Sequence, residues 1–277
     1  MMCELLDVSR SGYYAWCKRR ENPEPAPRQR RREQLVGQIR AVHQCSGQTY
    51  GSPRVYQELR AQGEQVCENT VARLMKEHNI RSVVKKRFKI RTTDSNHPHP
   101  IAPNRLERCF DQPLPNRAWA SDITYVRTDE GWLYLAAVID LCSRKIVGWA
   151  MADHLRAELC TEALRMALKQ RKPARHASDL VHHSDRGVQY ACEDYQDLLE
   201  RHGIVCSMSA AGDCYDNAVI ESFFKTLKVE CVYQQKYATK QQAASSIFRF
   251  IECWYNPRRR HSSLGYLSPD AYEASLN

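Results

Sequence analysis

From about residue 117 the sequence takes on a strand-like periodicity, and this change limits the folds that the chain can adopt. Three stretches rich in β-branched and aromatic residues follow one another, AWASDITYVRT, WLYLAAVIDL and KIVGWAM, with only DEG and CSR between them. Such short connections predict three consecutive antiparallel strands. After them the sequence predicts a helix over 156–170, a strand DLVHH, a helix near 193–201, a strand IVCSMS and a helix in GDCYDNAVIESFFKTLKVE. This order predicts an α/β fold with a mixed sheet flanked by helices. The tail from about residue 239 is predicted to be mainly helical and to end in the loop PRRRHSSLGYLSPDAYE.

The residues before this region predict a small all-helical domain. Apolar spacing predicts a helix over 27–44 and a second helix with Ser52 as its N-cap and Pro53 at its first position. After a glycine-containing turn, ENTVARLMKEHNI predicts a third helix that turns three apolar residues inward, Val71, Leu74 and Met75. The last two helices have the spacing of a helix-turn-helix, although other small helical domains share it. In that motif the second helix would present four polar residues to DNA: Asn69, Thr70, Arg73 and Lys76.

Positive charge is concentrated in the first part of the chain. The net charge is +9, and residues 1–105 hold 20 Lys and Arg against 10 Asp and Glu, whereas 106–277 hold 21 against 22. A basic module joined to a near-neutral remainder favours nucleic acid as a partner over a charged surface that only aids solubility. Residues 81–112 predict a linker, whose basic cluster either contacts phosphates or is a solvated charge run; it includes Lys85, Lys86 and Arg87.

The sequence lacks the marks of a membrane or secreted protein. Its longest apolar run, WLYLAAVI at 132–139, is too short to cross a bilayer, and the start has no signal-peptide pattern. The 12 cysteines include no C-x-x-C pair, so reduced thiols are favoured over a disulfide framework or a structural zinc site. We therefore expect a cytoplasmic protein without a membrane partner.

Three carboxylates stand out by their positions. Asp122 lies inside the first predicted strand, Asp185 directly follows the strand DLVHH, and Glu221 lies on the polar side of the helix in GDCYDNAVIESFFKTLKVE. These acids could converge at one edge of the sheet. Asp140 also ends a strand, and we rank it below the other three as a metal ligand. The adjacent letters of His183-Ser184-Asp185 do not form a hydrolase triad, because neighbouring strand residues point to opposite faces.

Three carboxylates in a small volume require a cation to hold them together. Mg²⁺ or Mn²⁺ fits, because hard cations prefer oxygen ligands, and two such ions would suit in-line displacement at phosphorus. The alternative is that Asp122 pairs with a buried arginine while the other two acids lie on the surface. From the residues alone, both readings remain open.

The motifs resemble those of a known family. WASDITY, HSDRG-x-QY and GD-x-YDNA-x-x-ES-x-x-x-x-LK-x-E, with 35 residues between Asp185 and Glu221, closely resemble the catalytic core of insertion-sequence-three (IS-three) family transposases, relatives of retroviral integrases. YGSPRV resembles the start of the family's helix-turn-helix, RTTDSNH…APN its linker, and YN-x-x-R-x-HSSLGYLSP its carboxyl-terminal signature. The resemblance therefore covers nearly the whole chain.

The resemblance implies a fold, a domain order and roles for residues. It implies a helical DNA-binding region at 1–80, a linker at 81–112, a ribonuclease-H-like integrase core at 113–235 and a helical extension at 236–277. Asp122, Asp185 and Glu221 would be the catalytic and metal-binding triad. Lys228 would contact the transposon end next to the scissile phosphate, and Asn217 would contact DNA and help to shape the site without being a metal ligand. Lys225 is open between pairing with Glu221 and contacting DNA.

The implied activity is DNA transposition in a bacterium, in association with the nucleoid. Water would first cut at a transposon end and free a 3′-hydroxyl, which would then attack another phosphodiester. Pairing two ends implies a homo-oligomer on double-stranded DNA, and the chain resembles a second-reading-frame product whose family partner is the upstream-frame product. Cys67 and Cys214 replace serines that the family pattern favours. The alternatives are a non-catalytic DNA-binding regulator and a general nuclease on the same fold.

Overall fold

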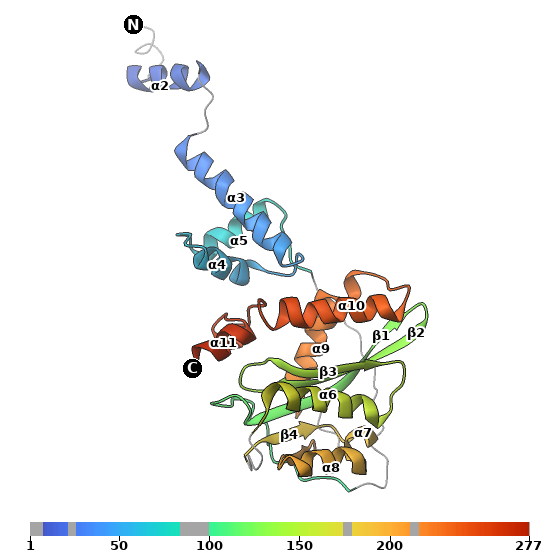
Figure 1. Cartoon of the computed structure of the whole chain (residues 1–277). Helices are drawn as coiled ribbons and strands as arrows, with labels where there is room; N and C mark the ends of the chain where they lie inside the picture. The colour runs from blue at the N-terminus through green and yellow to red at the C-terminus, as the bar shows by residue number, and fades with distance from the viewer. Residues whose placement is uncertain (1–7, 22–25, 84–99, 174–178, 211–215, 277) are drawn as a thin grey trace. The chain divides into compact units, whose positions relative to one another are not determined.

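The computed structural model describes residues 8–21, 26–83, 100–173, 179–210 and 216–276. The chain divides into two compact units, residues 1–82 and 83–277, which are described separately below (Figure 1). The predicted phosphate-contacting residues Lys85, Lys86 and Arg87 lie outside the described residues, as does Cys214. Within the described residues, no helix is long and apolar enough to cross a membrane.

The first unit is helical, as the sequence predicts. It comprises α2 (Arg10–Glu21), α3 (Pro27–Cys45), α4 (Ser52–Ala61) and α5 (Glu68–Glu77). The helices α3, α4 and α5 share a small core of side chains that are almost completely buried: Ile39, Val55, Leu59, Val71, Leu74 and Met75. This burial confirms the inward orientation predicted for the last three of these residues.

The N-cap predicted for α4 is wrong by one residue. Ser52 is the first residue of the helix, and Gly51 occupies the cap position with an extended backbone at φ −84° and ψ 178°. The carbonyl of Gly51 accepts the first helical hydrogen bond, from the Val55 amide at 3.1 Å. Ser52 therefore lies inside the helix rather than at its cap, and the cap residue, Gly51, has no side chain to accept a hydrogen bond.

The second unit is built on a five-stranded mixed sheet. Its strands are β1 (Ala118–Thr128), β2 (Gly131–Asp140), β3 (Ile146–Ala152), β4 (Val181–Ser184) and β5 (Val205–Met208), in the order β3-β2-β1-β4-β5. The first three strands pair antiparallel, and β4 and β5 are parallel to β1. The predicted strands and their order are therefore confirmed.

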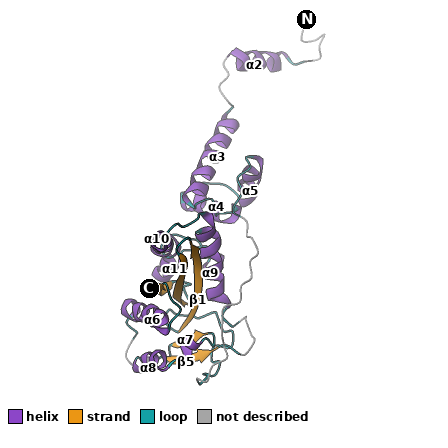
Figure 2. Cartoon of the chain, turned by 90° about the vertical axis from the view of Figure 1, so that its right-hand side faces the viewer, coloured by secondary structure: helices purple, strands orange, loops and turns teal. Residues whose placement is uncertain are grey.

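Helices cover both faces of the sheet. The face that carries α6 (Ala157–Arg171), α7 (Val188–Ala191) and α8 (Glu193–Arg201) forms one apolar core, and the face that carries α9 (Ala218–Glu230) and α10 (Lys240–Arg249) forms the other. Figure 2 shows β1 between α6 and α9. Helix α6 lies so close to β3 that a Cβ on Gly148 would meet the Ala163 carbonyl oxygen at 2.2 Å. Only glycine permits this approach.

The end of the chain is more ordered than the predicted loop. A 3₁₀ turn, η1 (Val232–Gln234), follows α9, and a π-helical segment, η2 (Phe250–Tyr255), continues α10. A second 3₁₀ turn, η3 (Ser262–Leu264), then leads to α11 (Pro269–Ser275). The hydroxyl of Ser268 caps α11 by accepting from the Ala271 amide at 3.2 Å, with Pro269 directly after it. A serine followed by proline is a typical helix start, so the loop prediction for these residues is wrong.

Candidate active site

Two of the three predicted carboxylates lie at one edge of the sheet. The parallel pairing of β1 with β4 extends from Ala118 to Ser121, and Asp122 is the next residue of β1. Asp185 is the first residue after β4, so both acids stand at the position where this pairing ends. They line the same cavity, which has a volume of about 300 Å³.

The turn that carries Asp185 is held by its own side chain. The carboxylate oxygen Oδ1 of Asp185 accepts a hydrogen bond from the Gly187 amide at 2.9 Å. A Cβ added at Gly187 would meet this oxygen at 3.0 Å and the Gln189 side-chain oxygen at 3.1 Å. The glycine therefore allows the turn to close against the carboxylate it positions.

Glu221 lies in the first turn of α9. The apolar stripe of this helix is buried against the sheet, as predicted, by Ile220, Phe223, Phe224 and Leu227. Glu221 itself is exposed, whereas Asp122 and Asp185 are partly buried. Among the residues that the structure describes, Glu221 forms no ion pair with Lys225. The predicted pairing of these two residues is therefore absent in this conformation.

Electrostatics links the three carboxylates. Burial raises the pKa of Asp122 well above its usual range, and the negative charges of Asp185 and then of Glu221 raise it further. Desolvation of its carboxyl group by the surrounding protein also raises the pKa of Glu221, although the residue is more exposed than Asp122. In the conformation described, no three His, Cys, Asp or Glu side chains of the described residues are close enough to hold one metal ion together. The acids are thus neighbours that repel one another, with Glu221 set back from the other two.

Lys228 lies on the same side of α9 and approaches β1. Its ammonium nitrogen lies 5.0 Å from the centre of the Tyr125 ring, in a cation–π contact. Burial lowers the pKa of Lys228, and the negative charge of Asp122 opposes this effect. Lys225, one turn earlier, is exposed. Lys228 is therefore the lysine of this helix that is placed beside the acids.

Asn217 joins the start of α9 to β1. Its side-chain nitrogen donates to the carbonyl of Ser121, the residue before Asp122, at 3.1 Å. The residue is only 6% exposed. This position suits the predicted role of shaping the site, whereas a direct contact with DNA, which we also predicted, disagrees with its burial.

Asp216 was missed by the sequence analysis, although it lies in the YDNA element. It is 2% exposed, and its carboxylate accepts hydrogen bonds from the Ala210 amide and from the Asn104 side chain, both at 2.9 Å. Arg108 also pairs with it, at 3.3 Å. Asp216, which lies two residues before α9, thereby binds two residues that precede β1, Asn104 and Arg108. Both lie inside the segment that the sequence predicted to be linker.

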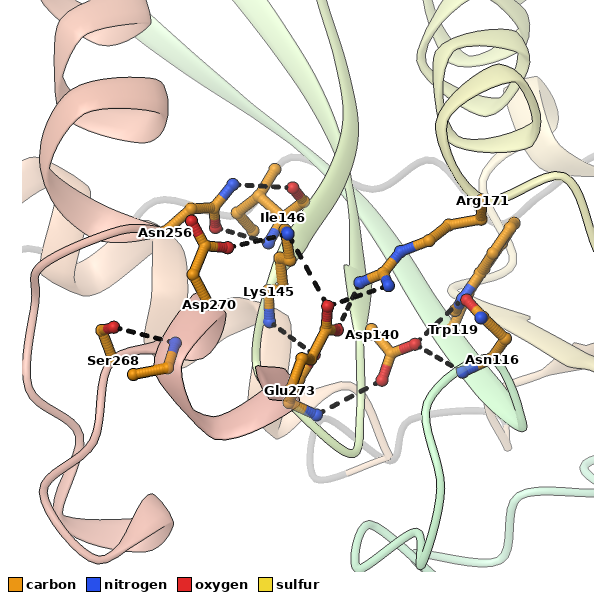
Figure 3. A network of polar contacts seen from close by, with 12 residues as sticks. Asn116, Trp119, Asp140, Lys145, Ile146, Arg171, Asn256, Ser268, Asp270 and Glu273 are labelled. Atoms are coloured by element: carbon orange, nitrogen blue, oxygen red, sulfur yellow. Dashed lines mark hydrogen bonds and ion pairs between the residues drawn. The ribbon is translucent and has the colours of Figure 1, made fainter. Parts of the chain in front are cut away.

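Asp140 does not approach the other acids. It pairs in register with Trp119, three residues along β1 from Asp122, which corresponds to about 10 Å. Its buried carboxylate accepts hydrogen bonds from the Asn116 amide at 2.7 Å, the Trp119 indole at 3.3 Å and two backbone amides of the β2–β3 turn (Figure 3). Since these donors hold the carboxylate in place, Asp140 is a structural residue.

The two histidines of β4 are also structural. His182 lies 2.7 Å from the Ser121 hydroxyl and 3.0 Å from the Tyr195 hydroxyl, while His183 lies 2.9 Å from the Ser207 hydroxyl. Burial lowers the pKa of His182 to about 3 and that of His183 to about 4. His183 is thus directed at β5 rather than at Asp185, and the rejection of a hydrolase triad is confirmed.

The carboxyl-terminal signature braces the second unit. The side chain of Asn256 accepts from the Ile146 amide and donates to the Ile146 carbonyl, each at 2.9 Å, and so binds the first residue of β3 (Figure 3). Arg259 forms two hydrogen bonds, of 2.8 and 2.7 Å, with the carboxylate of Glu230, the last residue of α9. The signature therefore holds β3 and the helix that carries Glu221.

In the first unit, α5 presents the polar side that the sequence predicts. Asn69, Arg73 and Lys76 are exposed, and Thr70 is partly exposed with its hydroxyl 3.1 Å from the Cys67 thiol. Their common position on the helix opposite its buried side is consistent with a recognition surface.

Comparisons with known proteins agree with this architecture. Two family models described as "Integrase core domain" match residues 112–214 and 202–269, and one described as "HTH-like domain" matches residues 30–88. Over 272 residues the chain is 45% identical to "Transposase InsF for insertion sequence IS3A" of Escherichia coli strain K12, covering 98% of this chain and 92% of the relative. It is also 43% identical to the "Insertion element IS600 uncharacterized 31 kDa protein" of Shigella sonnei, covering 98% and 97%.

Among solved structures, a chain of the simian T-cell lymphotropic virus intasome in complex with PP2A regulatory subunit B56 gamma matches with a TM-score of 0.49 and 12% identity, covering 85% of this chain and 74% of that one. The integrase-core matches bear out the predicted ribonuclease-H-like fold, and the HTH-like match bears out the helical module before it. With the identity extending along nearly the whole chain, the protein belongs to the IS3 family of insertion-sequence transposases.

Proposed function

We propose that this transposase cuts and joins the ends of its insertion sequence with Asp122, Asp185 and Glu221 as catalytic carboxylates that bind Mg²⁺ or Mn²⁺, as two ions. The observation that carries the proposal is the cavity shared by Asp122 and Asp185, with the charge of Glu221 acting on Asp122. A carboxyl group whose pKa is raised by neighbouring carboxylates, as that of Asp122 is, gains stability from a divalent cation, and oxygen ligands suit both metals. The three carboxylates are therefore the type of ligand that these metals prefer. A movement of Glu221 towards the two aspartates would complete the metal site.

The chemistry consists of two displacements at phosphorus. In the first, water attacks the phosphodiester at a transposon end, the bond to the 3′-oxygen breaks, and a 3′-hydroxyl is released. In the second, this hydroxyl attacks another phosphodiester, forming a new bond as the old P–O bond breaks. Bound cations would activate the attacking oxygen and stabilise the leaving one. Lys228 would hold a phosphate beside the acids, and Asn217 would keep the start of α9 against β1.

The partner in this function is double-stranded DNA at the transposon ends and target. We propose that Asn69, Thr70, Arg73 and Lys76 of α5 contact DNA, with α5 as the helix of the HTH-like module that enters the major groove. Joining two ends requires a homo-oligomer on DNA, and the upstream-frame product is the proposed protein partner. A bacterial transposase of this kind acts at the nucleoid.

The proposal is tested with labelled end DNA in a strand-transfer assay. We expect joined products from the wild type only with Mg²⁺ or Mn²⁺, and none from Asp185→Asn or Glu221→Gln, which keep the size of the side chain. Glu162→Gln is the matched control, because it changes a surface acid of α6, with a side chain that is 60% exposed, and leaves the three carboxylates in place. DNA binding that survives chelation, without cutting by the wild type under either metal, would instead support the non-catalytic regulator.

Gly187→Ala provides a second test, because it displaces a carboxylate without removing a charge. The φ of −63° at Gly187 is accessible to alanine, so the fold should persist with an unchanged melting temperature. The new Cβ, 3.0 Å from the Asp185 oxygen, should shift this carboxylate and lower strand transfer by about 10-fold or more. The rate is measured in the same assay, and an unchanged rate would show that the position of Asp185 is not critical.

A further inference from the structure

The cavity beside the acids has a second wall that the proposed chemistry does not use. Its volume is about 300 Å³, and in addition to Asp122 and Asp185 it is lined by the aromatic residues Tyr125, Trp132, Tyr134 and Tyr190. A cavity of this size is at the lower end of the range for small-molecule sites. The carboxylates thus occupy one part of a cavity in which four of the ten lining residues are aromatic.

The aromatic wall is built by the β1–β2 hairpin. Tyr125 and Tyr134 are directly opposite each other in the ladder, and Trp132 lies on the same face as Tyr134, two residues earlier. The rings of Tyr125 and Trp132 meet edge to face, with centres 5.0 Å apart and an interplanar angle of 89°. The paired strands therefore fix the positions of these rings. Tyr125 is three residues from Asp122 along β1.

Trp132 is too exposed to be explained as part of the core. Its exposed fraction is 43%, in contrast to the tryptophan of the same strand pair that is buried, Trp119, at 0%. An exposed indole at a rigid position beside a reaction site is typical of a surface that binds a flat, apolar group.

Positive charge lies at the edge of the same wall. The guanidinium of Arg127 is 5.9 Å from the centre of the Trp132 ring, and the ammonium of Lys228 is 5.0 Å from the centre of the Tyr125 ring. Aromatic faces beside cations are the combination that binds a single nucleotide, with the base on a ring and the phosphate near the cation.

We propose that this aromatic pocket receives a nucleobase of a nucleotide adjoining the scissile phosphate, unpaired from the DNA end, with Trp132 as its stacking platform. The inference rests on the proposed function, because the acids must act on the phosphate of that nucleotide. Stacking would hold the DNA strand where β1 is no longer paired with β4, with its phosphate at Asp122 and Asp185. Trp132 is then a substrate-binding residue that stabilises the opened DNA end.

A double-mutant cycle between protein and DNA tests the pocket. Wild type and Trp132→Ala are compared on end DNA that is intact or that carries one abasic nucleotide, placed in turn on each side of the cleavage position. On intact DNA, Trp132→Ala should slow strand transfer by about 10- to 100-fold, the usual effect of one base–aromatic stack. On DNA that lacks the stacked base, the two proteins should agree within about twofold.

Two further variants separate stacking from folding. Trp132→Phe keeps a ring and should retain most of the wild-type rate. Phe248→Ala removes an aromatic side chain that is 47% exposed on α10, away from the cavity, and should react like the wild type on every DNA. Melting temperatures are measured to check that each variant folds.

The same cycle is also measured by DNA binding in an Asp122→Asn background, which requires no catalysis. If Trp132→Ala lowers binding or rate by the same factor on intact and abasic DNA, Trp132 does not stack on a base and the pocket assignment is wrong. If the wild type joins no DNA while the binding cycle still shows coupling, the proposed catalytic function fails and the base pocket stands.

Discussion

Asp122→Asn is expected to abolish strand transfer and, at the same time, to raise the melting temperature of the protein. The loss of activity should be at least about 1,000-fold, because a bound cation contributes several kcal/mol of transition-state stabilisation and this variant removes one of the carboxylates that we propose as its ligands. The gain in stability follows from the electrostatics of the site without metal. Activity and stability should therefore change in opposite directions.

The sign of the stability effect follows from the pKa of Asp122. Burial and the charges of Asp185 and Glu221 raise this pKa in the folded protein. The unfolded chain therefore loses this proton at a lower pH than the folded protein does. As pH rises from the ordinary carboxyl pKa through the raised folded value, the ionised Asp122 costs stability, and at neutral pH the cost is present. Asparagine removes this charge while its side-chain oxygen can still accept from the Ile123 amide, a bond of 2.7 Å.

Thermal unfolding with and without metal measures both effects. Without metal, Asp122→Asn should melt above the wild type, and an increase of about 2–4 °C corresponds to ~1 kcal/mol in a protein of this size. Added Mg²⁺ should raise the melting temperature of the wild type and have a smaller effect on the variant. Asp140→Asn is the control, since Mg²⁺ should stabilise it as it does the wild type. A variant that melts below the wild type without metal would contradict the repulsion among the three acids.

The positions of Asp122 and Asp185 could be predicted because they depend on local patterns. Alternation identifies the strand of Asp122, and Asp185 directly follows an apolar strand, so chain order alone suggests that both lie at one sheet edge. Asp140 follows the same local pattern and yet has a different role. The difference depends on the donors Asn116 and Trp119, which reach its carboxylate only in the folded sheet.

Long-range contacts also explain what the sequence analysis missed. Asp216 is adjacent to Asn217 in a recognised motif, but its bond to Asn104 spans 112 residues of chain, and no periodicity reports such a contact. The wall formed by Tyr125 and Trp132 was read only as strand, because strand propensity and ligand stacking favour the same aromatic residues. The register of the hairpin and the exposure of Trp132 distinguish the two.

Arg259→Ala is expected to destabilise the second unit by about 3–5 kcal/mol, the usual cost of leaving one partner of a buried ion pair uncompensated. Both side chains of this pair are buried, with exposed fractions of 6% for Arg259 and 8% for Glu230. The guanidinium makes two hydrogen bonds to this carboxylate, lies 3.5 Å from His261 Nε2, and lies 5.9 Å from the centre of the Tyr255 ring. Denaturant unfolding measures the change in free energy.

A double variant separates the pair from the charge it leaves behind. Arg259→Met combined with Glu230→Met removes both charges and keeps apolar volume, so it should recover most of the stability lost in Arg259→Ala. If the double variant is no more stable than Arg259→Ala, packing of the arginine side chain rather than the ion pair accounts for the loss.

The pair also has a consequence for catalysis, because Glu230 ends the helix on which Glu221 and Lys228 lie. Without Arg259 the last turn of α9 loses its attachment to the carboxyl-terminal signature. Strand transfer by Arg259→Ala should therefore fall even at a temperature where the variant remains folded, while the Arg259→Met, Glu230→Met variant should regain stability more fully than activity. If stability and activity recover equally, the ion pair is not needed to position α9, because apolar contact then positions the helix equally well.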